Sequence, residues 1–505
     1  MRTDRLVSQV PELRVRTGSF GSTGSFGEVR ADGSYVLYWM IANRRPGWNY
    51  SLQRAIDWAL ALQKPLVVLE ALRSDYRWAS DRFHHFVIQG MADNSAHFRN
   101  KPVFYYPYLE PEPSRGAGLL KSLAADACMV VSDDFPCFFL PKILRAAARQ
   151  IRVRFELVDS NGIVPMRATE KTFLRAFDFR RFLQKRLPDF LLESPAPSPF
   201  SHVELPLLDS VPETVSCRWP IPDVEAMAAD LKWMRHIPID HQVGVASARG
   251  GFKAAEVRLG TFLENRLHSY GERPSHLQEE GTSGLSPYLH FGHISAHEIV
   301  AKTLSSASWS FDRLAERSSG SSKGWWGIDG NVESFLDQLI TWRELGYNMC
   351  SHRNDYDRYS SLPEWAQKTL EAHLRDQRDF QYALSEFESS ATHDALWNAA
   401  QTELVREGRI HNYLRMLWGK KILQWTESPR DALSIMIELN NKYALDGRNP
   451  NSYSGIFWIL GRYDRAWGPE RPVFGKIRYM SSKNTARKYK VADYITEYTS
   501  DEIRQ

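Results

Sequence analysis

The chain has 505 residues, of which 43% are hydrophobic and 25% are charged, and its formal net charge is +4. This composition is typical of a globular protein with room for two sizeable domains, and it excludes the fibrous and disordered classes. No apolar run reaches the roughly 18 residues that span a bilayer, and the amino terminus lacks a secretory pattern, so we expect a cytoplasmic protein without membrane contact. The four cysteines lack CxxC spacing, so neither a disulfide framework nor a metal site is predicted.

The chain begins with a segment of unusual composition. Residues 1–33 are rich in Gly, Ser and Arg and include the near-repeat GSFGSTGSFG. Because such a segment buries too little apolar surface to order itself, we expect a flexible tail.

Strand-like and helix-like segments alternate over residues 34–192. Short β-branched or aromatic runs such as YVLYWMI and CMVVSDD are separated by helical stretches such as SLQRAIDWALALQ. This alternation predicts a Rossmann-like α/β domain with a doubly wound parallel sheet. Polar turns follow two strand ends, near residues 42–49 and 133–138, where ligands of such sheets usually bind. The sequence has no GxGxxG, so an ordinary dinucleotide site is not predicted.

The second half of the chain has a different pattern. Residues 193–222 are dense in proline and follow no sustained period, which predicts an extended interdomain linker. Over residues 223–505 the apolar residues recur at three-to-four spacing, for example in ESFLDQLITWRELGYNM. This period predicts an all-α carboxy-terminal domain.

The segment GTSGLSPYLHFG of the helical region has the features of an anion-binding helix start. Ser286 suits the N-cap and Pro287 the first helical position, and Thr282 and Ser283 come just before them. Backbone N–H groups at such a start can bind a diphosphate without a lysine. The alternative is an ordinary capped helix.

Tryptophans recur in the helical region. Trp418 and Trp425 lie seven residues apart on one predicted helix, so they share a face and are separated by about 10 Å along its axis. Trp397 comes shortly before this helix. Tryptophans at such spacing can pass an electron to a buried oxidant, and the alternative is that they are core aromatics.

Polar residues follow the tryptophan helix in an otherwise apolar region. Asn440 and Asp446 begin the polar turn LNNKYALDGRNPN, and Arg415 is placed to pair with Asp446. Such a pair, if aimed at a flavin ring, would stabilise negative charge on the reduced ring.

Basic residues gather near the carboxyl terminus. Residues 471–490 contain seven Lys or Arg residues and no Asp or Glu, interleaved with aromatic residues. Such a stretch can follow a phosphate backbone, and the alternative is a solvated surface.

Several of these segments together resemble class II cyclobutane-pyrimidine-dimer photolyases of the photolyase/cryptochrome superfamily. The resemblance rests on motifs in family order, namely LSPYLHFG, WRELGYN, THDALWNAAQ, HNYLRMLWGKKILQW, NKYALDGRNPN and the terminal DRAWG with GKIRYMS. It implies light-driven repair of damaged double-stranded DNA by a monomer that binds FAD in the helical domain. It also implies an antenna, a deazaflavin or a folate, at the strand ends of the first domain.

The resemblance implies roles for the flavin side of the site. Asn440 matches the asparagine that faces flavin N5, and Trp418, Trp397 and Trp425 match the electron-transfer triad in that order from flavin to surface. The other implied cofactor-binding residues are Tyr270, Thr282, Ser283, Leu285, Ser286, Arg415 and Asp446.

The resemblance also implies a DNA side. Trp342 and Trp458 match the aromatic walls against the flipped bases, and Met416 matches a pocket methionine. Arg465 and Arg478 match the basic residues that hold the DNA and its vacated gap.

Two departures leave the substrate open. Gln338 stands where the family usually has a glutamate that hydrogen-bonds the dimer, and Pro274 and Ser275 replace a common Arg-Asn pair. An amide donates a hydrogen bond but supplies no proton, which favours slower repair or another substrate. The alternatives are therefore a cryptochrome-like photoreceptor without repair and a photolyase-like flavoprotein with a different substrate.

Overall fold

A computed structural model describes residues 6, 8–17, 27–272 and 281–499, and the chain forms two compact units. The α/β unit comprises Met1–Glu170, Arg186–Thr261 and Leu285–Phe311. The helical unit comprises Lys171–Lys185, Phe262–Gly284 and Asp312–Gln505. No described helix is both long and apolar enough to cross a bilayer.

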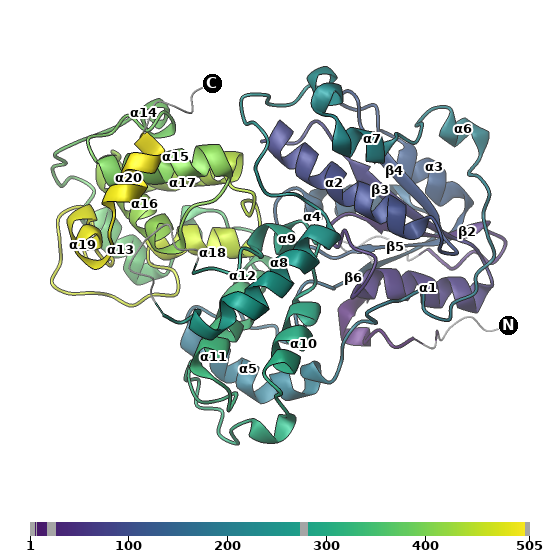
Figure 1. The fold of residues 1–505 in the computed structure, drawn as a ribbon, viewed down its shortest axis with the longest axis horizontal. Coiled ribbons are helices and arrows are strands. Elements are labelled where there is room, and N and C mark those ends of the chain that lie inside the picture. The colour runs from purple at the N-terminus through teal and green to yellow at the C-terminus, as the bar shows by residue number, and fades with distance from the viewer. Residues whose placement is uncertain (1–5, 7, 18–26, 273–280, 500–505) are drawn as a thin grey trace. The chain divides into compact units, whose positions relative to one another are not determined.

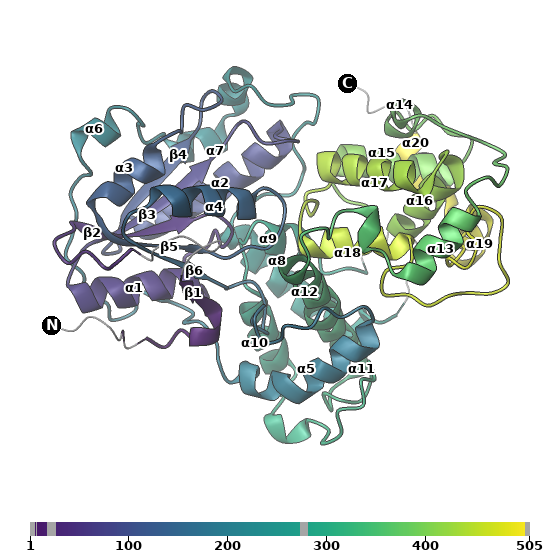
Figure 2. The ribbon, with the colours of Figure 1, turned by 180° about the vertical axis from the view of Figure 1, so that it is seen from behind.

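The α/β unit contains a six-stranded sheet in the order β1-β6-β5-β2-β3-β4 (Figures 1 and 2). Strands β2 to β6 run parallel to one another, and the edge strand β1 is antiparallel to β6. The two central strands are fully buried because helices cover both faces of the sheet. The strands are β1 (Val15–Thr17), β2 (Tyr35–Met40), β3 (Leu66–Leu72), β4 (Phe104–Leu109), β5 (Ala127–Asp133) and β6 (Arg154–Val158).

Helices pack on both faces of this sheet (Figures 1 and 2). Tyr38 and Met40 of β2 belong to the hydrophobic cluster that includes α1, whereas the phenol of Tyr35 donates to the carbonyl of Leu123 in α3. Side chains of a strand alternate between the two faces, so α1 and α3 lie on opposite sides. The predicted doubly wound α/β architecture is thus confirmed. The crossover helices are α1 (Tyr50–Leu62), α2 (Asp81–Phe98), α3 (Leu119–Asp126) and α4 (Leu140–Gln150).

The predicted flexible tail over residues 1–33 is wrong for residues 12–17. Glu12–Arg14 form a 3-10 turn, η1, and β1 then pairs with β6, with Val15 opposite Val158. The reason is Arg14, whose fully buried guanidinium donates to three backbone carbonyls, those of Asp159, Gly162 and Ile163, at 3.2, 3.0 and 2.6 Å. The rest of the prediction falls partly on residues 1–5, 7 and 18–26, which lie outside the described residues.

The predicted linker over 193–222 and the predicted start of the helical domain at 223 need correction. Residues 193–222 mostly lack regular secondary structure, but they pack on the α/β unit, where Trp219 is buried and its indole donates to the carbonyl of Arg115 at 2.8 Å. Further along, α7 packs against α2. The segment 186–261 therefore belongs to the first unit, because its apolar side chains complete that core.

The other helical segments follow in chain order. Helix α12 packs closely on α18, and α16, α17 and α18 pack on one another. The segments are α5 (Ala176–Leu191), α6 (Glu213–Ser216), α7 (Val224–Ala229), η2 (Leu231–His236), α8 (Phe252–Asn265), η3 (Leu267–Ser269), α9 (Ser286–His290), α10 (Ala296–Ser306), η4 (Phe311–Arg313), α11 (Gly330–Leu336), η5 (Asp337–Trp342), α12 (Arg343–His352), η6 (Tyr359–Ser361), α13 (Glu364–Ala372), α14 (Leu384–Glu388), α15 (Ala395–Glu407), α16 (Asn412–Trp425), α17 (Pro429–Tyr443), α18 (Pro450–Ile459), α19 (Ser482–Lys488) and α20 (Ala492–Thr499).

Candidate functional site

The three predicted electron-transfer tryptophans are neighbours in the helical unit. Trp418 and Trp425 lie on α16, and Trp397 lies on α15. The indole N–H of Trp397 donates to the backbone carbonyl of Trp418 at 3.0 Å, and the ring centroids of Trp397 and Trp425 are 6.0 Å apart. The indole N–H of Trp418 is satisfied by the amide oxygen of Gln401 at 2.8 Å. The structure therefore brings the three tryptophans together, with Trp397 joined to Trp418 through a backbone hydrogen bond and to Trp425 through a ring contact.

The outer end of this chain differs from the expectation. Trp425 is only 2% exposed, so it is not the surface member of the triad. Tyr382 and His393 pack on its ring, with centroid distances of 5.8 and 4.9 Å. The phenolic oxygen of Tyr382 lies 2.7 Å from Nδ1 of His393, an exposed residue. Sequence reasoning missed Tyr382 because it precedes α15 in a separate segment and follows no helical spacing.

A second group of predicted residues forms a polar centre around α16 and α17. Nη2 of Arg415 lies 3.1 Å from Oδ1 of Asp446, and both side chains are largely buried. Asn440 is 3% exposed, and its amide N–H donates to Oγ of Ser452 at 2.7 Å. Buried polar side chains require such partners. These residues lie on or beside helices that pack on one another, so the structure keeps them within one helical layer.

The predicted anion cradle begins a short helix. Helix α9 starts at Ser286 with Pro287 in its first turn, but the N-cap position is Leu285, and no side chain caps the helix. The predicted N-cap is therefore wrong by one residue, and the apolar side chain of Leu285 has no oxygen with which to cap the helix. Thr282 and Ser283 come just before Leu285 in the chain. Gly284, which directly precedes Leu285, has a φ of +67°.

Tyr270 lies on the helical unit. Its ring packs on Phe262 and Phe335, with centroids 5.7 and 5.2 Å away, and burial raises the pKa of Tyr270 to about 12. The phenol therefore stays protonated near neutral pH and acts as a neutral hydrogen-bonding group. Pro274 and Ser275, which follow it, lie outside the described residues.

Gln338 and Trp342 share one π-helical turn, η5, between α11 and α12. The side chain of Gln338 is exposed and that of Trp342 is half-buried. Such turns are rare, break the α-helical register and occur frequently at functional sites. Both side chains are accessible to a ligand of the helical unit.

Two cationic side chains lie close to the ring of Trp458 on α18. The guanidinium carbon of Arg478 lies 5.3 Å from the indole centroid, and Nζ of Lys420 lies 5.2 Å from it. Lys420 is fully buried and donates to the backbone carbonyl of Ile459 at 2.5 Å. Burial lowers the pKa of Lys420 to about 7. Trp458 itself is half-buried, so part of its ring remains accessible.

The two predicted DNA-binding arginines have different surroundings. Arg478 pairs with Asp464 through Nε and Nη2 at 2.9 and 3.2 Å and lies 4.0 Å from the Trp467 ring. Burial by itself would raise the pKa of Asp464, but hydrogen bonds from Arg478, a backbone N–H and Trp467 lower it. Arg465 also lies over Trp467, at 4.4 Å, but it is exposed and makes no ion pair with a described residue. Arg465 is thus the freer cation.

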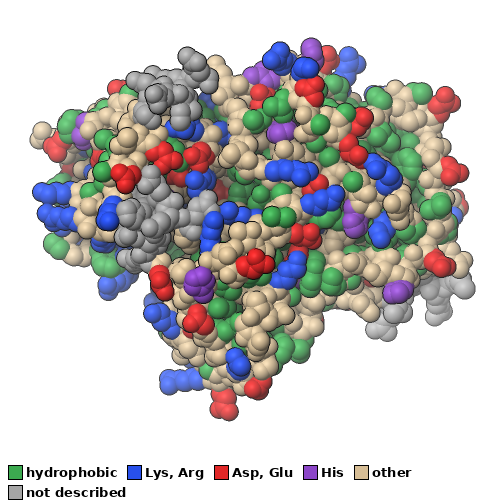
Figure 3. Space-filling model, in the orientation of Figure 1, with side chains coloured by type: hydrophobic (Ala, Val, Ile, Leu, Met, Phe, Trp, Pro, Cys, Tyr) green, Lys and Arg blue, Asp and Glu red, His purple; other side chains and the backbone are tan. Residues whose placement is uncertain are grey.

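The basic stretch after this cluster contributes further positive charge. Helix α19 has no acidic residue in its first turn and ends with Arg487 and Lys488. Lys and Arg side chains gather at the edge of the helical unit where α19 lies (Figure 3). An accessible indole, exposed arginines and a cationic helix form the kind of surface that binds nucleic acid.

Known proteins similar to this chain agree on one family. No protein-family model matches the chain. It is 35% identical over 464 residues to the deoxyribodipyrimidine photo-lyase of Methanothermobacter thermautotrophicus, covering 92% of this chain and 94% of the relative. It is 35% identical to that of Oryza sativa subsp. japonica (92% and 87%) and 31% identical to that of Potorous tridactylus (91% and 80%).

A solved structure shares the fold. The bacterial class III photolyase from Agrobacterium tumefaciens matches with a TM-score of 0.63 and 16% identity, over 95% of this chain and 88% of that protein. This likeness supports the arrangement of an α/β unit followed by a helical unit. The identity and coverage of the curated relatives show that the chain belongs to the deoxyribodipyrimidine photo-lyase family, within the photolyase/cryptochrome superfamily.

Proposed function

We propose that the protein repairs cyclobutane pyrimidine dimers in DNA in a light-driven reaction, with FAD as its cofactor. The observation that carries the proposal is the buried chain of Trp418, Trp397 and Trp425, which lies in the same helical layer as the polar centre of Arg415 and Asp446. The names of the relatives at 31–35% identity support the same activity. The assignment to class II rests on the sequence motifs.

The residues of the helical unit suit a flavin. A carboxylate-paired guanidinium and a buried amide offer hydrogen bonds to the polar edge of a flavin ring, and the tryptophan rings offer an apolar surface beside it. Asn440 would face N5, and Arg415 with Asp446 would lie at the ring. Tyr270, Thr282 and Ser283 of the helical unit would contribute to binding the phosphates, whereas Leu285 and Ser286 belong to the α/β unit. When bound and reduced, FAD supplies the electron for repair after absorbing blue or near-ultraviolet light.

The tryptophans keep the site in its reduced form. Trp418 would donate an electron towards the cofactor and be restored by Trp397, which Trp425 restores in turn. Tyr382 and the exposed His393 both pack on Trp425, and Nδ1 of His393 lies 2.7 Å from the phenolic oxygen, so an oxidised phenol would have an acceptor for its proton. Burial of all three indoles excludes water from the chain.

The DNA side of the site has the groups that a flipped lesion requires. Trp342 and Trp458 present accessible rings that can stack on unpaired bases, and Met416 is half-buried on α16. Gln338 can donate an amide hydrogen bond to a pyrimidine carbonyl. Arg465 has no competing ion pair with a described residue and would bind phosphate.

The proposal is tested by anaerobic photoreduction of the purified protein, followed by blue-light exposure with an oligonucleotide that contains a single thymine dimer. Restored thymines are counted by chromatography. We expect restoration in the light and none in a matched dark sample. Efficient photoreduction without restored thymines would contradict repair.

One observation favours a second function. Gln338 is exposed on the π-helical turn and cannot supply a proton to a reduced dimer. A cryptochrome-like photoreceptor would retain the tryptophan chain and need no proton donor at this position. The same experiment separates the two, because a photoreceptor would reduce its flavin in light and leave the dimer intact.

A further inference from the structure

Helix α4 of the α/β unit carries a line of basic side chains and none of the predicted site residues. Lys142, Arg145 and Arg149 are exposed and recur at spacings of three and four residues, so they share one face of the helix. Leu144 and Ala147 are buried, so a different face packs on the unit. The three exposed basic residues are called the α4 stripe below.

The positive charge of the α4 stripe is not neutralised within the fold. None of its three cations makes an ion pair or a side-chain hydrogen bond with a described residue. Residues 135–155 contain five Lys or Arg residues and no Asp or Glu. The two carboxylates that flank this run are held by other arginines, Asp134 by Arg16 at 2.7 Å and Glu156 by Arg54 at 2.8 Å. The stripe therefore presents unpaired positive charge to solvent.

Helix stability does not explain this arrangement. Like charges three or four residues apart on one helix repel each other, and both neighbouring pairs of the stripe have this spacing. Lys142 lies in the first turn, near the positive end of the helix dipole, where a cation is unfavourable. The same turn has no acidic residue, and no side chain caps the helix. The stripe thus destabilises α4 in the free protein, and a bound anion would relieve the repulsion.

The composition of the exposed face favours a nucleic-acid partner. Apart from the stripe, the exposed residues of α4 are Ala146 and Gln150. The face therefore lacks the exposed apolar side chains that enter a lipid interface and the aromatic anchors that dominate protein interfaces. Two of its three cations are arginines, whose planar guanidinium groups bind phosphate oxygens in bidentate fashion. Lys142 and Arg149 are about 10 Å apart along the helix axis, the axial length of about three phosphates of one DNA strand.

We propose that the α4 stripe binds the phosphate backbone of duplex DNA and gives the α/β unit a DNA-contacting surface of its own. Each cation neutralises one phosphate, so the contact is independent of base sequence. The inference rests on the proposed function in taking DNA as the partner, but it needs neither a flavin nor a dimer. It adds to the DNA-side residues predicted above, which all belong to the helical unit, namely Trp342, Met416, Trp458, Arg465 and Arg478.

Binding of undamaged duplex DNA to the full-length protein tests this surface, with fluorescence anisotropy measured over a range of salt concentrations. The double variant Arg145→Glu and Arg149→Glu should bind at least about tenfold more weakly near 0.1 M salt, and its salt slope should fall by about two. The double variant Arg145→Lys and Arg149→Lys keeps both charges and should keep the salt slope of the unaltered protein. Circular dichroism confirms that each variant is folded.

The matched control is the double variant Lys101→Glu and Arg235→Glu, which makes the same change in net charge. Both residues are exposed cations in other segments of the α/β unit, without an ion pair to a described residue. Because salt screens distant charges, this control should change the affinity by less than about threefold.

The outcomes separate this surface from the proposed function. Weaker duplex binding by the charge-reversal variant alone supports the stripe, even if the unaltered protein restores no thymines in the repair experiment. The inference is overturned if that variant binds duplex DNA like the unaltered protein, if the control loses as much affinity, or if the unaltered protein does not bind duplex DNA. Unchanged duplex binding together with lost binding of polyglutamate would assign the stripe to an acidic protein instead.

Discussion

At the residue scale, replacing Trp418 tests the proposed electron-transfer path. Its indole is 2% exposed and bonded to Gln401, so replacement by phenylalanine removes the donor while largely filling its volume. We expect Trp418→Phe to bind FAD normally and to lose nearly all photoreduction of the oxidised cofactor. The loss of flavin absorbance under anaerobic blue light measures this, with Trp233→Phe in the α/β unit as the control. If this variant were photoreduced at the rate of the unaltered protein, Trp418 would not be part of the electron-transfer path.

Lys420 is a residue whose environment predicts a pH dependence of stability. Burial lowers its pKa to about 7 from the ordinary 10.5. Between these two values the unfolded chain holds a proton that the folded protein has released, so the free energy of unfolding from this group rises with pH. The slope is at most about 1.4 kcal/mol per pH unit, starts near pH 7 and ends near pH 10.5.

Replacing this lysine should remove its share of the pH dependence. Lys420→Met keeps the aliphatic stem beside Trp458 and has no titratable group, so its stability should rise less between about pH 7 and about pH 9. Urea unfolding at several pH values measures the difference. Identical pH dependence in the two proteins would mean that Lys420 titrates normally.

At the element scale, we expect two arginines of the loop that follows α18 to have different roles in DNA binding. Arg465 is exposed without an ion pair to a described residue, whereas Arg478 is held by Asp464 and lies against Trp458. We expect Arg465→Ala to weaken binding to all duplexes and to lower the salt slope by about one phosphate contact.

Arg478→Ala should act differently, because it leaves Asp464 unpaired and removes the support of the Trp458 ring. We expect a larger loss of affinity for dimer-containing DNA than for undamaged DNA. Fluorescence anisotropy over a range of salt concentrations compares both variants on both duplexes. If both replacements changed the salt slope equally and neither changed the preference for damaged DNA, the two arginines would have the same role.

The contact between α12 and α18 depends on a glycine. A Cβ at Gly346 would lie 2.6 Å from the carbonyl oxygen of Pro450 and 2.8 Å from Oγ of Ser454. Gly346→Ala should therefore cost about 1–3 kcal/mol of stability, because the two helices must separate.

A second helical glycine is the matched control for this contact. Gly455 lies on α18, and a Cβ added there would meet no described atom within 4 Å, so Gly455→Ala should be neutral or stabilising by up to about 1 kcal/mol. Thermal unfolding of both variants measures the difference. Equal melting temperatures would show that the two helices can separate without cost.

At the scale of the whole molecule, the fold class was predictable and the unit boundaries were not. Strand–helix alternation and a later three-to-four period were sufficient for an α/β unit and a helical unit. The same patterns placed the boundary near residue 223, whereas residues 186–261 and 285–311 belong to the α/β unit. An amphipathic helix shows that it buries one face, but its sequence does not say which core receives that face. The same limit explains why β1 was not predicted. This strand is held in place by backbone carbonyls that bind Arg14 and lie far along the chain.

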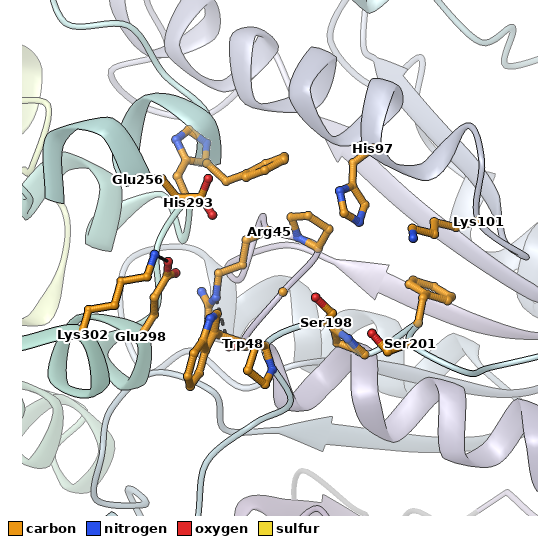
Figure 4. A pocket seen from close by; sticks show the side chains of 16 residues that line it. Arg45, Trp48, His97, Lys101, Ser198, Ser201, Glu256, His293, Glu298 and Lys302 are labelled. Carbon is orange, nitrogen blue, oxygen red and sulfur yellow. Dashed lines mark hydrogen bonds and ion pairs between the residues drawn. The ribbon is translucent and has the colours of Figure 1, made fainter. Parts of the chain in front are cut away.

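Sequence pattern alone was enough for the two kinds of architecture, for the tryptophan pair of α16 and for the pairing of Arg415 with Asp446, because each follows from local periodicity or from recognisable motifs. Long-range contacts were needed to join Trp397 to that pair, to bury Trp425 beneath Tyr382, and to hold Arg478 against Asp464 and Trp458. Packing also brings Trp48, His97, Glu256 and Glu298 of the α/β unit together around one pocket (Figure 4). The physical reason is that a residue's burial and partners depend on chain segments distant in sequence, whose approach only the folded structure decides.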